Sequence, residues 1–218
     1  MRDPFYYDPT RPDFQDRLYA IYRTLRDERP LHHEPSTGQW ILSRHEDVRA
    51  AACDHASFSS EGTDISRGLL PMIQSLDPPR HDALRARVLQ VFTAKRISLL
   101  EPEIRTLPRI ARRDVVLHGV TIPAGAQVRL LWGSANRDER AFPDPDRFDT
   151  TRDARGHLAF GQGIHFCLGA HLARLETRVA FEELLARIPD YRLAEPPTWR
   201  PSIWARAHPE VRVEFEPA

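Results

Sequence analysis

The sequence has few cysteines, no excess of charge of either sign and no long apolar run. Its two cysteines, Cys53 and Cys167, lie far apart in 218 residues and outside any C-x-x-C pair, which argues against a secreted disulfide scaffold and a zinc ribbon. The 31 basic and 31 acidic side chains cancel, so charge does not favour a nucleic-acid partner. No stretch approaches the ~20 apolar residues of a membrane span, and residues 1–5 lack the apolar segment of a signal peptide. We therefore expect a soluble, cytoplasmic protein that binds neither nucleic acid nor membrane.

The most informative stretch is residues 160–169, F-G-Q-G-I-H-F-C-L-G, which we call the cysteine loop. Its glycines, Gly161 and Gly163, allow a positive φ or a close approach to a flat, bulky group. Cys167 comes just before a predicted helix start, where free N–H groups and the helix dipole favour a thiolate. A thiolate is both a nucleophile and a metal ligand. A lone cysteine is more often a small buried apolar residue, but the fixed spacing of phenylalanine, glycines, histidine and cysteine favours a ligand.

The cysteine loop resembles the signature of the cytochromes P-450, the haem-thiolate monooxygenases. The resemblance continues through residues 170–176, as in soluble bacterial members of the family. It implies that Cys167 is the proximal ligand of the iron of haem b, whose thiolate donates electron density that helps to cleave a bound O–O bond. It also implies that Phe160, Gly161, His165 and Gly169 belong to the cofactor-binding residues.

Residues 77–85, D-P-P-R-H-D-A-L-R, predict a helix start with the aspartate as its cap and proline in the first turn. His81 and Arg85 are four residues apart, so they share a helix face, and a solvated face is the commoner meaning of such a pair. This block also resembles the cytochromes P-450. The resemblance implies that His81, Arg85, Arg109 and His165 bind the haem propionates, since charge-assisted hydrogen bonds suit carboxylates.

The remaining sequence predicts a mostly α-helical fold with a minor β part, of the α+β class. Apolar spacing and capping signals predict helices over 14–29, 43–54, 77–92, 93–106 and 168–188. Alternation and turn residues predict strands at 31–34, 39–42, 107–117, 120–122 and 127–132, with short strands between 191 and 215. We divide the chain into an N-terminal part, 1–106, and a C-terminal part, 107–218, which together form a single haem-binding domain.

Family members are about twice as long as this chain, and the resemblance breaks off between about Ile104 and Pro108. The family's distal helix, which carries an acid and a threonine for proton delivery, has no counterpart there. Nor has its E-x-x-R helix, since the similar run at 46–49 lies on an early predicted helix. We therefore expect a truncated P-450-like fold whose helices pack less completely than in the family.

Three functions are compatible with these patterns. The first is a haem-thiolate monooxygenase that hydroxylates a small hydrophobic organic substrate with O₂ and electrons from a ferredoxin or flavodoxin. The second is a haem-binding remnant or carrier with little or no monooxygenase activity. The third is a non-haem metal site at Cys167, His165 and His171, although no second pair completes a tetrahedral set. For the electron donor, a basic face is expected from Arg105, Arg112, Arg113, Arg137, Arg140 and Arg174.

Overall fold

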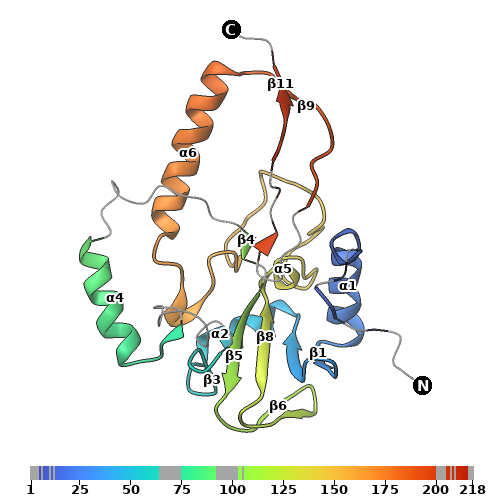
Figure 1. The fold of residues 1–218 in the computed structure, drawn as a ribbon, viewed down its shortest axis with the longest axis vertical. Helices are drawn as coiled ribbons and strands as arrows, with labels where there is room; N and C mark the ends of the chain where they lie inside the picture. The colour runs from blue at the N-terminus through green and yellow to red at the C-terminus, as the bar shows by residue number, and fades with distance from the viewer. Residues whose placement is uncertain are drawn as a thin grey trace.

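The computed structural model describes residues 5, 7–9, 11, 13–63, 75–91, 103–104, 106–199, 205–206, 208 and 210–215. It has an α+β fold, as the sequence predicts. Figure 1 shows a twisted sheet at one end of the molecule, flanked by α1 (Phe14–Glu28) and α2 (His45–Cys53), with the long helix α6 (Ala170–Arg187) extending away from it. The other described helices are α4 (Arg80–Val91), the short α5 (Trp132–Ala135) and the single 3₁₀ turn η2 (Gly163–His165).

The main sheet joins strands from distant parts of the chain. Its five strands lie in the order β1-β2-β8-β5-β3, with all neighbours antiparallel except the parallel pair β2–β8. The strands are β1 (Leu31–Glu34), β2 (Gln39–Leu42), β3 (Phe58–Ser59), β5 (Thr106–Ala111) and β8 (Gln127–Leu131). Three two-stranded pairs accompany it. They are β6 (Val115–Leu117) with β7 (Val120–Ile122), β4 (Glu103–Ile104) with β10 (Ala205–Arg206), and β9 (Arg192–Leu193) with β11 (Val213–Glu214).

Two groups of buried side chains hold the helices against the sheet. On α1, Leu18, Tyr22 and Leu25 are at most 1% exposed and pack with Ile41 and Leu131. Burying such side chains contributes on the order of 2 kcal/mol each. The second group joins α2 and α5 to the sheet and includes Val48, Val128, Leu130 and Trp132. The predicted helix at 14–29 and the hairpin at 31–42 are therefore confirmed. Ile21 on α1 is only half-buried, however, and the buried residues of β1 are His32 and Glu34.

Helix α2 forms as predicted, but the prediction that a capping box begins it is wrong. The N-cap residue is Arg44, whose side chain makes no capping bond. The Ser43 hydroxyl instead donates to the carbonyl of Pro30 at 3.3 Å. The N–H of His45 donates to Asp138 Oδ2 at 2.9 Å. A carboxylate from the chain's second half thus occupies the place that the sequence assigned to a neighbouring serine.

The region from 92 to 106 differs from the predicted helix where the structure describes it. Residues 103–104 form β4 and residue 106 begins β5, while 92–102 and 105 lie outside the described residues. Ile104 pairs with Ala205 in the β4–β10 ladder. Pairing with a distant strand therefore determines the backbone conformation here, and the local helical spacing of apolar residues does not. A smaller difference is that Trp132 begins α5 and does not end β8.

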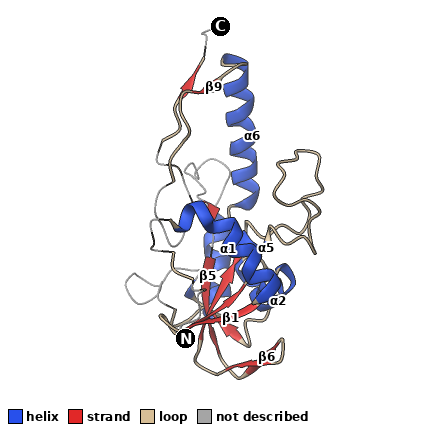
Figure 2. Ribbon diagram, turned by 90° about the vertical axis from the view of Figure 1, so that its right-hand side faces the viewer, coloured by secondary structure: helices blue, strands red, loops and turns tan. Residues whose placement is uncertain are grey.

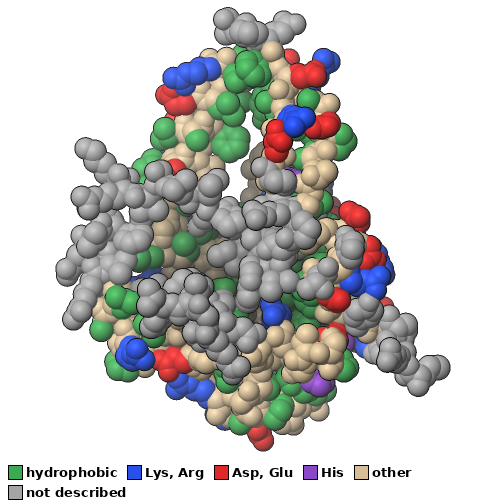
Figure 3. Space-filling model, in the orientation of Figure 1, with side chains coloured by type: hydrophobic (Ala, Val, Ile, Leu, Met, Phe, Trp, Pro, Cys, Tyr) green, Lys and Arg blue, Asp and Glu red, His purple; other side chains and the backbone are tan. Residues whose placement is uncertain are grey.

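Helix α6 confirms the predicted helix after Cys167, but most of its apolar side chains are exposed. Leu175 is 45% exposed and Val179 is 48% exposed, and Phe181, Leu184 and Leu185 are also exposed. Figure 3 shows hydrophobic side chains gathered over α6 and the C-terminal strands. Figure 2 shows the helix extending well beyond the sheet. Helix α6 therefore carries an exposed apolar side. No helix among the described residues is long and apolar enough to cross a membrane.

Candidate functional site

The cysteine loop, which contains η2 and leads directly into α6, folds back on itself. The N–H of Cys167 donates to the carbonyl of Phe160 at 2.8 Å, and the N–H of Phe166 donates to that of Gly163 at 3.0 Å. Cys167 is half-buried and belongs to no disulfide. A Cβ on Gly169, the N-cap residue of α6, would lie 3.9 Å from Cys167 Sγ. The sulfur therefore lies beside a helix N-terminus, where the dipole favours a thiolate.

A glycine allows the cysteine loop to pack directly against α2. Gly163 has φ +70°, and a Cβ there would lie 2.6 Å from the carbonyl oxygen of Ala52, in the last turn of α2. No side chain fits at that distance, so the loop requires glycine at this position for space as well as for conformation. Gly161 also has φ +70°, with more room around it.

Arg85 connects α4 to the cysteine loop. Its guanidinium donates to the carbonyls of Ile164 at 3.3 Å and Phe166 at 3.0 Å. These two carbonyls flank His165 in the sequence, so Arg85 holds the backbone on both sides of that histidine. Two nitrogens of the Arg85 guanidinium thus stabilise the backbone of the cysteine loop, a role that the sequence does not predict.

Four of the predicted site residues come together, and we call them the cation cluster: His81, Arg85, Arg109 and His165. The rings of His81 and His165 meet edge to face, with centroids 4.7 Å apart. Burial, and then the positive charges of Arg109 and His81, lower the pKa of His165 to about 3, against an opposing effect of Asp77. His165 is therefore a neutral imidazole in this setting. His81 is 1% exposed, and its Nδ1 lies 2.9 Å from Asp82 Oδ1.

Arg109 is a buried charge without a close counter-ion. Arg109 is only 3% exposed, and its Nη1 donates to the carbonyl of Pro108 at 2.9 Å. It forms no ion pair with any residue that the structure describes. Burial lowers the pKa of Arg109 to about 10, and the more distant Asp77 only partly offsets this effect. An unpaired buried guanidinium is costly, so this position is suited to an anionic ligand.

Phe160 lies at the edge of the site. The guanidinium carbon of Arg174 lies over its ring, 4.6 Å from the centroid, and the Phe166 ring lies 6.5 Å away. Phe160 thus contributes an aromatic surface beside Cys167, with a cation from α6 on one face.

Two positions at the site, Ser60 and Asp77, are missed or misread from the sequence. Ser60, which follows β3, places its hydroxyl 2.8 Å from His165 Nε2. Asp77, predicted to cap α4, directs its carboxylate to the Ser59 hydroxyl, the N–H of Ser60 and Arg112. No spacing in the sequence links these residues to the cysteine loop, because the contacts join segments that the fold alone brings together.

The described residues do not support a non-haem metal site. Among them, no three His, Cys, Asp or Glu side chains come close enough to hold a metal ion. His165 contacts Ser60 and His81, whereas His171 is an exposed residue at the start of α6. Cys167, His165 and His171 therefore do not form a metal site among the described residues.

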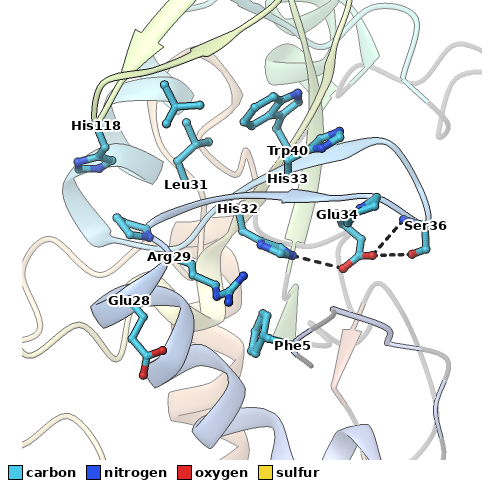
Figure 4. Close-up of a pocket in the computed structure, with 13 residues that line it drawn as sticks. Phe5, Glu28, Arg29, Leu31, His32, His33, Glu34, Ser36, Trp40 and His118 are labelled. Atoms are coloured by element: carbon cyan, nitrogen blue, oxygen red, sulfur yellow. Dashed lines mark hydrogen bonds and ion pairs between the residues drawn. The ribbon is translucent and has the colours of Figure 1, made fainter. Parts of the chain in front are cut away.

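A groove of about 1230 Å³ lies along β1, away from the cysteine loop. In Figure 4, His33 and Trp40 lie on one side of the β1–β2 hairpin, and His32 and Phe5 lie on the other. The His32 Nε2 lies 3.3 Å from Glu34 Oε2. The lining residues include no member of the cysteine loop or the cation cluster, so the groove is separate from the candidate site.

Comparisons with known proteins agree with this arrangement. Residues 100–191 match the family model described as Cytochrome P450. The Biotin biosynthesis cytochrome P450 of Bacillus subtilis is 49% identical over 208 residues, covering 90% of this chain and 52% of that protein. The 6-deoxyerythronolide B hydroxylase of Saccharopolyspora erythraea is 48% identical over 114 residues, covering 50% of this chain and 28% of that protein. The chain thus spans about half or less of the length of these curated relatives.

Solved structures show the same fold. The cytochrome P450 CYP109Q5 from Chondromyces apiculatus superposes with a TM-score of 0.80 at 21% identity, over 97% of this chain and 98% of that one. A mutant of P450 EryK in complex with erythromycin B gives a TM-score of 0.80 at 20% identity, over 92% of this chain and 96% of the other.

Proposed function

We propose that this chain, which belongs to the cytochrome P450 family, would hold haem b, the cofactor that the family implies, with Cys167 as the residue that would bind the iron. The observation that carries the proposal is the buried Arg109, which forms no ion pair with any described residue and lies beside the His165 imidazole of the cysteine loop. Haem brings two carboxylates and an iron atom. The cation cluster suits the carboxylates, and the sulfur of Cys167 suits the iron, so the residues present fit the group.

Each residue of the site has a proposed part. Cys167 binds the iron as a thiolate, which the N-terminus of α6 stabilises. His81, Arg85, Arg109 and His165 bind the propionates. Phe160, Gly161 and Gly169 form the surface beside the sulfur. When bound, a haem with a thiolate ligand supplies the oxygen chemistry that defines the family.

For the reaction we propose hydroxylation of a small hydrophobic organic substrate with O₂. A second candidate is a haem-binding protein with little monooxygenase activity, and one observation favours it. Strands β4 and β5 follow each other with only Arg105 between them, where the family resemblance places the missing distal helices. Productive cleavage of an O–O bond needs a positioned proton donor and exclusion of water. We therefore expect poor coupling between reductant consumed and product formed.

The proposed electron donor is a ferredoxin or flavodoxin. The arginines expected to form a basic face for it are largely paired with acids. Arg112 contacts Asp77 at 2.6 Å, and Arg140 contacts Asp27 at 3.1 Å. Arg137 pairs with Asp146. Arg105 lies outside the described residues. A docking surface on these arginines would carry less net charge than the sequence alone suggests, so its steering of an acidic donor would be weak.

We also propose that the two parts of the chain, 1–106 and 107–218, act as one haem-binding domain. The main sheet supports this, because β1, β2 and β3 come from the first part and β8 from the second. The cation cluster has the same division: His81 and Arg85 precede the boundary, and Arg109 and His165 follow it.

The test is the carbon monoxide spectrum of the reduced protein after addition of haem. The chain should give the long-wavelength Soret band of a thiolate-ligated iron, and Cys167→Ser should lose it while retaining some haem. Cys53→Ser is the matched control, because Cys53 is the other cysteine and is exposed. An unchanged band in Cys167→Ser would contradict the proposal. With a redox partner added, the ratio of product to reductant then separates the two candidate functions.

A further inference from the structure

A hydroxyl outside the predicted site contacts the histidine of the cysteine loop. Ser60 Oγ lies 2.8 Å from His165 Nε2, and Ser60 is 2% exposed. Ser60 directly follows β3, the edge strand of the main sheet, whereas His165 ends η2. This hydrogen bond therefore joins the edge of the sheet to the cysteine loop.

Ser60 is itself fixed by the buried carboxylate of Asp77, which is 3% exposed. The N–H of Ser60 donates to Asp77 Oδ1 at 3.1 Å, and Arg112 Nη2 donates to Oδ2 at 2.6 Å. The Ser59 hydroxyl also donates to Oδ2. A carboxylate with three donors, one of them charged, has little freedom to move. Asp77 thus sets where the backbone of Ser60 lies.

A hydrogen bond at Nε2 determines the tautomer and the orientation of the His165 imidazole. A neutral imidazole has one N–H and one bare nitrogen, so the partner at Nε2 decides which nitrogen carries the proton. It also restricts rotation of the ring. The other nitrogen is then oriented with a defined donor or acceptor character, as outer partners do for histidines that bind metals.

We propose that Ser60, held by Asp77, is a positioning residue that orients His165 for a carboxylate of the cofactor. The proposal rests on the proposed function, because it takes His165 as a propionate ligand. Ser60 acts through His165 and contributes no ligand of its own. Ser60 lies outside every element and motif that the sequence predicts, so the contact is visible only in the fold.

The first test is the rate at which haem leaves the full chain for an excess of a haem-scavenging protein. Ser60→Ala should raise this rate about tenfold, the scale typical of lost outer-shell hydrogen bonds. Ser57→Ala is the matched control. Ser57 is 1% exposed, lies on the same segment and accepts a bond from Arg113 Nε at 2.9 Å, so its loss perturbs the fold without touching His165. The control rate should stay within about twofold of the unchanged chain.

A double-mutant cycle separates orientation from general stability. With His165→Ala already present, Ser60→Ala should have no further effect on haem dissociation, because its route of action is gone. Equal acceleration by Ser60→Ala in both backgrounds would overturn the proposal, since Ser60 would then act on the fold and not through His165.

A measurement without haem keeps this proposal distinct from the proposed function. Nitrogen NMR of the His165 imidazole should show one tautomer in the unchanged chain and in Ser57→Ala, and a mixture in Ser60→Ala. Absence of a thiolate spectrum in the unchanged chain would contradict ligation of haem iron by Cys167 while leaving the tautomer result to stand. An unchanged tautomer in Ser60→Ala would contradict the positioning role even if the chain binds haem.

Discussion

The His81 and His165 rings meet edge to face, with centroids 4.7 Å apart and planes at 72°. One ring comes from α4 and the other from η2, so this contact is where α4 reaches the cysteine loop. Arg109 approaches from β5 and adds a buried charge to the same place. Three separate elements therefore direct nitrogen-bearing side chains to one small volume, which costs stability unless an anion enters it.

Replacement of Arg109 should separate stability from cofactor binding. Arg109→Met removes a buried charge that has no ion pair in the part of the chain that the structure describes, so the unfolding free energy of the haem-free chain should rise by about 1 to 3 kcal/mol. The same variant should lose haem at least about tenfold faster, because a charge-assisted bond to the propionate is gone. Urea unfolding and haem transfer measure the two effects.

The control for Arg109 is Arg113→Met, which removes a guanidinium whose side chain is 70% exposed. It should change the unfolding free energy by no more than about 0.5 kcal/mol and leave haem retention unchanged. If Arg109→Met destabilised the haem-free chain, its guanidinium would have a stabilising partner and the anion-site interpretation would fail.

Gly163 should be far less replaceable than a glycine of similar backbone conformation elsewhere. Gly163→Ala puts a methyl group 2.6 Å from the carbonyl oxygen of Ala52, whereas Gly156→Ala, at φ +90°, meets nothing within 4 Å. Both changes carry a conformational cost of about 1 to 2 kcal/mol. Gly163→Ala should cost a further ~2 kcal/mol by displacing the loop from α2, and it should weaken the thiolate spectrum. Similar unfolding curves for the two variants would show that the loop is not seated on α2.

Local patterns predicted the elements that local sequence determines. The apolar spacing of residues 14–25 gave α1, and Pro35-Ser36-Thr37-Gly38 gave the turn between β1 and β2, because a few neighbouring residues decide each. Such local patterns cannot predict contacts between segments that lie far apart in the sequence. Asp138 caps α2 from the other half of the chain, and Ser60 meets His165 through the fold. The strand at 103–104 needed its partner at 205–206.

Asp138 should make stability depend on pH. Burial raises the pKa of its carboxyl, but hydrogen bonds from the N–H groups of His45 and Arg140, and from the Arg140 guanidinium, outweigh it, so the pKa lies below the ordinary 3.8. A lowered pKa contributes stability that is present above about pH 4 and is lost as the pH falls below it.

Asp138→Asn should therefore lower the unfolding free energy at pH 6 by about 1 to 3 kcal/mol. The difference from the unchanged chain should shrink as the pH falls toward 3. Asp153→Asn, at an exposed ion pair with Arg155, should leave the unfolding curve unchanged at pH 6. A pH-independent difference for Asp138→Asn would mean that the ionised carboxylate is not what stabilises α2.

The exposed side of α6 should tolerate polar substitution. Val179 is 48% exposed, so Val179→Ser should change the unfolding free energy by less than about 1 kcal/mol while reducing the fluorescence of a bound hydrophobic dye. Leu158 is 0% exposed, and Leu158→Ser should cost about 2 to 5 kcal/mol. A loss as large for Val179 as for Leu158 would show that α6 is covered in solution.

The parallel pairing of β2 with β8 sets an order for folding during synthesis. The β1–β2 hairpin can close as soon as residue 42 is free, but its inner edge pairs with Val128 and its neighbours, far along the chain. At ~5–20 residues per second, a ribosome needs on the order of five to twenty seconds to supply that strand. During this interval β2, which contains the apolar Trp40 and Leu42, has an unpaired edge. Such an edge can pair with a wrong strand. Yield in cells should thus respond to translation speed between residues 42 and 131, and slower synthesis should prolong the exposure.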